Sequence, residues 1–141
     1  MHNIDPKIWG PSMWKVLIYS VLSYPDEPNK EEQINMKNFL VCVGKILPCE
    51  KCRYNYANHT TKYIINDEVL NNKKKLIDWL TSVYNEVRTM NRQKKLTSDE
   101  IIYKYTEDQY NKKITNIIYI IMLIIIIFLL IFFIKYKPKN N

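Results

Sequence analysis

The chain has 141 residues, enough for one compact domain of about 100 residues and a distinct, strongly apolar C-terminal quarter. Its formal charge of +7 is uneven, because residues 1–113 carry 18 Lys and Arg against 14 Asp and Glu, a net charge of +4, and Lys135, Lys137 and Lys139 supply the rest. The lysines are scattered among acidic residues and form no basic helix or arginine cluster, which argues against nucleic-acid binding.

The first half of the domain predicts two helices. Residues 11–23 are dense in apolar side chains and predict a largely buried helix, which would begin after a Trp-Gly-Pro turn because Pro11 suits a first helical turn. Two prolines make residues 24–28 a loop. Residues 30–46 then carry apolar side chains at helical spacing, at Ile34, Met36, Phe39, Leu40, Val43 and Ile46. They predict a second, amphipathic helix.

The second half of the domain predicts three more helices and no strand. Leu47-Pro48 ends the second helix, and a third runs from Cys49 to about Ile65, with Tyr54, Tyr56, Tyr63, Ile64 and Ile65 as candidate buried residues. The polar stretch 66–75 leads into a fourth helix over residues 76–87, with Trp79 on its flank. Thr97 or Ser98 caps a fifth helix, which continues through Tyr105. The expected domain is therefore all-helical.

The segment 114–134 holds 21 residues, the length of a helix that spans about 30 Å of hydrocarbon, so we expect one transmembrane helix. Lysines flank both ends, and charge therefore does not set its orientation. The N-terminus lacks a secretory signal pattern, and the late position of the span favours a tail anchor with the domain on the cytosolic side. The expected organisation is a domain over 1–108, a linker over 109–113, the span over 114–134 and a basic tail over 135–141.

Cys49-Glu50-Lys51-Cys52 is the motif that carries the most chemical information. Two cysteines three residues apart at a helix start can form an accessible disulfide, and the helix N-terminus favours the thiolate. Lys51 and Arg53 add positive charge nearby. In a reducing compartment such a pair is more often catalytic or metal-binding than structural.

Two other interpretations of the motif remain open. Cys42, Cys49, Cys52 and His59 could together ligate zinc, but their spacing does not match common zinc sites and no second Cys-x-x-Cys is present. Cys42 is more simply a small packing residue of the second helix, and His59 a solvated or hydrogen-bonded helix histidine. A thioredoxin-like site would need a central sheet, for which the sequence around Cys49 offers no strand.

Three separated motifs, taken in order, resemble the Erv/ALR family of FAD-linked sulfhydryl oxidases, and most of all the short oxidases of large DNA viruses. The motifs are residues 9–14 with two tryptophans, residues 47–52 with the Cys-x-x-Cys, and residues 79–87. The resemblance covers about residues 5–108. It implies a four-helix bundle with a short fifth helix, an FAD cofactor beside the cysteines, and a homodimer.

The resemblance also implies roles for individual residues. Cys49 and Cys52 would form the redox disulfide, and no metal would be bound. The expected FAD-contacting residues are Trp9, Gly10, Trp14, Tyr84, Asn85, Val87 and Lys94. The chain departs from the family pattern at Ile18, Tyr84 and Arg88, where the family often has His, His and Asn, so the details of cofactor contact are open there.

The expected function is oxidation of dithiols to disulfides in partner proteins. A substrate thiolate would attack Cys49, and electrons would pass through Cys52 to FAD and then to molecular oxygen, yielding hydrogen peroxide. The resemblance implies a protein dithiol or a thioredoxin-like shuttle protein as the partner, and a host intracellular or virion membrane as the location. The alternatives are a membrane-anchored zinc-binding or interaction module without redox activity, and a flavoprotein that has lost the oxidase activity.

Overall fold

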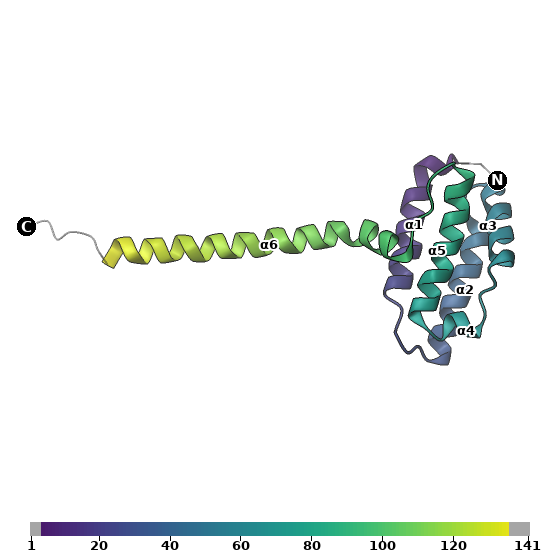
Figure 1. The fold of residues 1–141 in the computed structure, drawn as a ribbon, viewed down its shortest axis with the longest axis horizontal. Helices are drawn as coiled ribbons and strands as arrows, with labels where there is room; N and C mark the ends of the chain where they lie inside the picture. Colours follow the sequence, from purple (N-terminus) through teal and green to yellow (C-terminus); the bar gives the residue numbers. More distant parts are fainter. Residues whose placement is uncertain (1–3, 136–141) are drawn as a thin grey trace, which may run out of the picture. The chain divides into compact units, whose positions relative to one another are not determined.

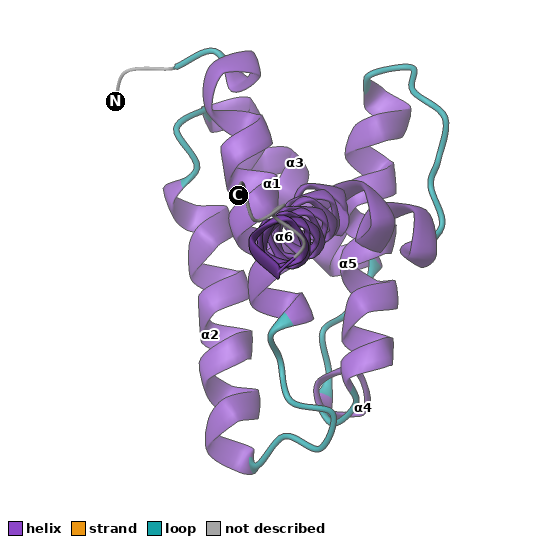
Figure 2. Cartoon of the chain, turned by 90° about the vertical axis from the view of Figure 1, so that its left-hand side faces the viewer, coloured by secondary structure: helices purple, strands orange, loops and turns teal. Residues whose placement is uncertain are grey.

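The computed structural model describes residues 4–135, and the side chains of all of these except residues 108–110, 130, 133 and 134. The described part is helical and contains no strand, as predicted (Figures 1 and 2). The chain divides into two units, one ending at Tyr105 and one beginning at Thr106. The helices are α1 (Pro6–Leu22), α2 (Lys30–Ile46), α3 (Glu50–Lys62), α4 (Asp67–Leu70), α5 (Lys73–Met90) and α6 (Ser98–Lys135).

Polar side chains set the helix starts. Asn29 begins α2 with a capping box, in which its Oδ1 accepts from Glu32 N at 2.9 Å and its own N donates to Glu32 Oε2 at 2.8 Å. Thr97 and Glu100 form the same arrangement before α6, which identifies Thr97 as the predicted cap. Each box satisfies backbone donors that have no partner within the helix.

The first helix begins earlier than predicted. Asp5 caps α1, its carboxylate accepting from Lys7 N at 2.9 Å, and Pro6 occupies the first helical position. Pro11 therefore lies inside α1 and not at its start. It removes only one backbone hydrogen bond, close to an end that is already capped, so the helix continues through it.

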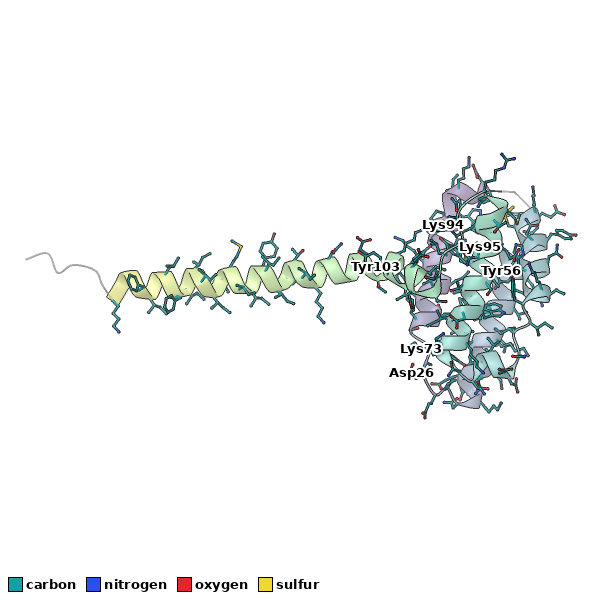
Figure 3. All side chains as sticks on the ribbon, viewed as in Figure 1. Asp26, Tyr56, Lys73, Lys94, Lys95 and Tyr103 are labelled. Carbon is teal, nitrogen blue, oxygen red and sulfur yellow. A yellow bond between two sulfur atoms is a disulfide. The ribbon has the colours of Figure 1, made fainter. Side chains whose placement is uncertain are left out.

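The polar stretch 66–75 also contains helix that the apolar pattern does not predict. Asn66 caps the single turn α4, and Asn72 caps α5, each accepting from a backbone N at 3.0 Å. Leu70 is buried, and its carbonyl accepts the hydroxyl of Tyr24 at 2.8 Å. At the same end of the bundle Lys73 lies 3.9 Å from Asp26 of the loop between α1 and α2 (Figure 3).

The bundle core lies between α1, α2, α3 and α5. Its buried side chains include Leu17, Ile18, Val21, Leu40, Val43, Leu76, Leu80 and Val83. Trp79, expected on the flank of the helix, is buried too, and its Nε1 donates to the Tyr63 carbonyl at 2.8 Å. Ile34, Ile46, Tyr54 and Ile64 are exposed although they were candidate core residues. Each helix buries only one face, so not every apolar position reaches the core.

The second unit contains the apolar segment. Asn111–Leu129, 19 residues of α6, is long and apolar enough to cross a membrane, and none of it is buried. Length and composition alone support this assignment. α6 also runs unbroken through residues 109–113, which were expected to form a linker.

Candidate functional site

The Cys-x-x-Cys motif forms the start of α3. Cys49 is the N-cap and Cys52 lies in the first turn, with a disulfide between them. The Cys49 Sγ also accepts the backbone N–H of Cys52 at 3.2 Å. Both residues are partly buried, and Cys52 packs against the hydrophobic core. Of the two cysteines, Cys52 is the one that contacts the core.

Hydrogen bonds from two other segments fix the turn that carries Cys49. Arg53 Nη1 donates to the Leu47 carbonyl at 2.6 Å, which ties α3 to the end of α2. The N–H of Ile4 donates to the Pro48 carbonyl at 2.9 Å, and Trp9 Nε1 donates to the Ile4 carbonyl at 3.1 Å. Trp9 is thus connected through two hydrogen bonds to the residue before Cys49.

The local charge favours a thiolate at Cys49. The residue stands at the positive end of the α3 dipole, and Lys51 and Arg53 follow within one turn, against the single carboxylate of Glu50. An electropositive, partly exposed helix start is the environment of reactive cysteines, whereas structural cysteines are usually buried and inert.

A second group of predicted site residues meets in an aromatic cluster on α1, α5 and the first turns of α6. The rings of Trp14 and Tyr84 are 4.6 Å apart at an interplanar angle of 80°. Tyr105 lies edge-on to Tyr84 at 6.4 Å and to Tyr19 at 6.5 Å, and the Tyr19 hydroxyl donates to the Tyr105 carbonyl at 2.8 Å. The structure therefore brings Trp14 and Tyr84 together, from motifs that are about 70 residues apart.

Two cations lie on the ring of Tyr84. Arg88 is 5.7 Å and Lys104 5.9 Å from its centroid, and Lys104 Nζ is 3.3 Å from its hydroxyl. Burial raises the pKa of Tyr84, but the hydrogen bonds from Tyr105 and Lys104 and the charge of Lys104 outweigh burial and leave that pKa below its ordinary value. Arg88 follows Tyr84 by one turn, a signal present in the sequence, whereas only the tertiary fold reveals Lys104.

Asn85 and Arg88 hold the loop that carries Lys94. The Asn85 side chain donates to the Leu96 carbonyl at 2.8 Å and accepts from the Leu96 N–H at 2.9 Å. Arg88 Nε donates to the Lys94 carbonyl at 2.6 Å, and the Lys94 side chain is exposed beside that of Lys95, after the end of α5 (Figure 3). Asn85 therefore has a structural task in addition to any contact with a cofactor.

Two further predicted contact residues, Gly10 and Val87, lie on α1 and α5. No protein atom outside its own helix and neighbours lies within 4 Å of the point where a Cβ on Gly10 would stand, so there is open space at this position. Val87 is half-buried on α5. Flat half-buried rings, open space at a glycine and a group of cations match the needs of FAD, which combines flat rings with a pyrophosphate.

Cys42 and His59 differ from their predicted environments. Cys42 is a free cysteine, and it is exposed on the outer face of α2 and does not pack in the core. His59 is buried with no hydrogen-bond partner for Nε2, and burial lowers its pKa below the ordinary 6.5. Within residues 4–135, the side chains described include no group of three or more His, Cys, Asp or Glu that could hold a metal.

Comparisons with known proteins identify the family of the chain. Residues 11–111 match the Erv1 / Alr family. A probable FAD-linked sulfhydryl oxidase of Acanthamoeba polyphaga mimivirus is 35% identical over 99 residues, which cover 70% of this chain and 69% of the relative. An FAD-linked sulfhydryl oxidase of African swine fever virus is 28% identical over 110 residues, covering 78% and 86% of the two chains.

The fold has a solved counterpart. The core of yeast Erv1 superimposes with a TM-score of 0.65 at 23% identity, covering 74% of this chain and 86% of the yeast structure, which supports the fold alone. The family match covers most of the chain and includes the Cys-x-x-Cys turn and the aromatic cluster. The chain is a member of the Erv1 / Alr family.

Proposed function

We propose that the chain is an FAD-linked sulfhydryl oxidase that forms disulfide bonds in partner proteins, with Cys49 and Cys52 as the redox pair. The observation that carries the proposal is the Cys49–Cys52 disulfide at an electropositive helix start, with Cys52 packed against the core. Family membership and relatives named as FAD-linked sulfhydryl oxidases support the same activity.

In the first step a substrate thiolate attacks the Sγ of Cys49. A bond forms between the substrate sulfur and Cys49, the Cys49–Cys52 bond breaks, and Cys52 leaves as a thiolate. The second substrate thiol then gives up its proton and attacks the substrate sulfur of this mixed disulfide. The substrate leaves as a disulfide, and Cys49 and Cys52 together hold its two electrons.

The reduced pair must then be reoxidised. FAD, when bound, supplies a two-electron acceptor that passes the electrons to molecular oxygen and yields hydrogen peroxide. Because Cys52 packs against the core, Cys49 is proposed to receive the substrate and Cys52 to face the cofactor. The positive helix end stabilises the thiolate form of the pair between turnovers.

The residues proposed to hold FAD come from the two clusters already described. Trp9, Gly10 and Trp14 on α1 offer rings and open space, and Tyr84 on α5 contacts Trp14. Asn85 and Val87 are proposed as contacts from the same segment of α5. Lys94, and with it Arg88 and Lys104, supply the positive charge that a pyrophosphate requires.

The apolar segment of α6 is proposed to anchor the oxidase to a membrane, with the domain facing the cytosol and a host intracellular or virion membrane as its location. Its support is the length and complete exposure of Asn111–Leu129, with Lys112 and Lys113 at its start and Lys135 after it. Resistance to carbonate extraction tests the membrane anchor. Digestion of the domain by protease added outside intact vesicles tests whether the domain faces the cytosol.

The oxidase is also proposed to act as a homodimer on a protein dithiol or a thioredoxin-like shuttle protein. Exposed apolar side chains on two neighbouring helices, Ile8 and Val16 on α1 and Ile34 on α2, support a dimer because such side chains gain from being covered. Sedimentation of the full chain in detergent tests the dimer: Ile34→Asp should shift the population towards monomer.

The activity is tested on the full chain purified in mild detergent. The protein should be yellow, and it should consume oxygen when dithiothreitol is added, with hydrogen peroxide accumulating in proportion. Cys49→Ala should remain yellow and stop consuming oxygen. A colourless protein, or oxygen uptake that survives Cys49→Ala, contradicts the proposal.

A further inference from the structure

A groove runs between α2 and α3 on the outer side of the bundle, and neither the redox pair nor the aromatic cluster accounts for it. Its volume is about 400 Å³. Three of the lining residues lie in the last turns of α2 and five lie along α3, and they are Val41, Gly44, Lys45, Arg53, Tyr54, Tyr56, Ala57 and Thr60. All of them lie in the described part of the chain.

Small residues and one fixed ring give the groove its shape. The Tyr56 hydroxyl donates to the Leu40 carbonyl at 2.9 Å, which holds the ring across the floor. The ring lies so close to Gly44 that a Cβ there would stand 2.8 Å from Tyr56 Cε1 and closer still to Cδ1. The small side chain of Ala57 leaves the α3 side of the groove open. The groove therefore results from the close packing of α2 against the fixed ring of Tyr56 and from the small residues beside it.

The chemistry of the lining is basic and apolar. Lys45 and Arg53 are the charged lining residues, and no carboxylate is among the eight side chains. Glu50 and Lys51, in the turn above, offset each other. Val41 and Tyr54 present exposed apolar surface, with 42% and 68% of their surface accessible. Such a lining complements a chain segment that carries both a carboxylate and an apolar side chain.

The groove starts beside the reactive disulfide. The Arg53 N–H donates to the Cys49 carbonyl at 3.0 Å, and the Arg53 side chain reaches Leu47, two residues before Cys49. From Arg53 to Thr60 the helix advances about 10 Å, which an extended chain covers with three or four residues. A peptide whose cysteine attacks Cys49 can therefore lay its next few residues along the groove.

We infer that this groove docks the protein substrate of the oxidase. Its occupant is an extended segment next to the attacking cysteine, with an Asp or Glu at Lys45 and Arg53 and an apolar side chain in the hollow over Gly44 and Ala57. The inference rests on the proposed oxidase function and adds the substrate class: acidic, apolar-flanked dithiol segments. Small thiols reach Cys49 without using the groove.

The test compares two synthetic dithiol peptides that differ only in their flanks, one with Asp and Leu beside the cysteines and one with Lys in place of Asp. For the full chain in detergent, the acidic peptide should have the higher kcat/KM for oxygen uptake. Lys45→Glu should lower that kcat/KM about fivefold to tenfold and leave turnover of dithiothreitol unchanged. Lys37→Glu, an exposed lysine of α2 outside the lining, is the matched control and should have little effect.

A second pair of variants tests the hollow itself. Ala57→Trp fills the groove and should abolish the preference for the acidic peptide, whereas Asn58→Trp places the same bulk at an exposed neighbouring position outside the lining. Equal kcat/KM for the two peptides in the unmodified chain overturns the inference. So does a loss of dimer in Ala57→Trp with unchanged peptide kinetics, because a second copy of the chain would then cover the groove.

Binding separates this inference from the oxidase activity. A fluorescent acidic peptide with serines in place of its cysteines should bind the full chain, and Lys45→Glu should weaken its Kd while Lys37→Glu should not. Binding that follows this pattern in a protein that oxidises no thiol upholds the docking groove and contradicts the oxidase proposal. Thiol oxidation without selective binding upholds the oxidase and overturns the groove.

Discussion

The Cys49–Cys52 turn and the aromatic cluster around Tyr84 are assembled in opposite ways. The turn is largely local, since the disulfide, the cap and the hydrogen bond from Arg53 to Leu47 join residues within seven positions of one another, and one backbone hydrogen bond, from Ile4 to Pro48, comes from a distant segment. The cluster is tertiary, because its rings and cations come from α1, α5 and α6. A local site keeps its chemistry as long as one helix start survives, whereas a tertiary site depends on the packing of the whole bundle.

The largest expected effect is on the local site. Cys52→Ser should reduce thiol-dependent oxygen uptake by a factor of about 10³ or more, because the remaining Cys49 can accept substrate but has no partner to complete the disulfide. Mixed disulfides should accumulate on Cys49, visible as an added mass under non-reducing conditions. A Cys52→Ser protein with ordinary turnover contradicts the assignment of the redox pair.

A change in the tertiary site should have a smaller but broader effect. Trp14→Ala removes the ring that packs on Tyr84 and should cost about 2 kcal/mol in the free energy of unfolding, less than for a fully buried tryptophan. The flavin content of the purified protein should fall as well. Ile64→Ala, at a largely exposed apolar position, is the control and should change stability by less than about 0.5 kcal/mol. Full flavin content in Trp14→Ala would show that FAD binding does not depend on the aromatic cluster.

The burial of His59 should make the stability of the domain depend on pH. Burial is the main cause that lowers the pKa of His59. The charge of Glu86 on α5 raises that pKa, and the charge of Lys62, on the same helix as His59, lowers it further. Because the folded state binds the proton less readily than the unfolded state, the neutral histidine gives full stability above about pH 6.5 and stability is lost as the pH falls below it. Urea unfolding at about pH 7.5 and about pH 5.5 should show this loss.

His59→Leu should remove that part of the pH dependence, and His2→Gln, which changes the other histidine of the chain, should leave it in place. Acid sensitivity that is equal in His59→Leu and in the unmodified chain would show that the pKa of His59 is the same in the folded and the unfolded state.

The smallest expected effect is that of Cys42→Ser. Cys42 is exposed and has no disulfide partner, so its loss should change turnover and the free energy of unfolding by amounts within measurement error. Oxygen uptake with dithiothreitol and thermal unfolding of the full chain measure both. A loss of activity in this variant would place Cys42 on the path of electrons and revise the two-cysteine account.

The same contrast explains what could be predicted from the sequence. Apart from the single turn α4, the helices, the cap at Thr97 and the Cys-x-x-Cys at a helix start follow from neighbouring residues, and the sequence predicts them. The burial of Trp79 and His59, and the approach of Lys104 to Tyr84, depend on which helix faces pack together, which a spacing pattern does not specify. The predicted start of α1 was too late because the prediction treated Pro11 as the first helical residue. Asp5 and Pro6 also form a helix-start signal, and they mark the start that the structure shows.

Anaerobic titration of the full chain with dithiothreitol tests whether electrons pass from a dithiol through Cys49 and Cys52 to bound flavin. The yellow absorption should bleach after two equivalents, one for the disulfide and one for the flavin, and admitting oxygen should restore the colour. A Cys49→Ala, Cys52→Ala double variant that still binds flavin should show no rapid bleaching. Bleaching of that variant at the rate of the unmodified chain would show that the two cysteines do not carry the electrons.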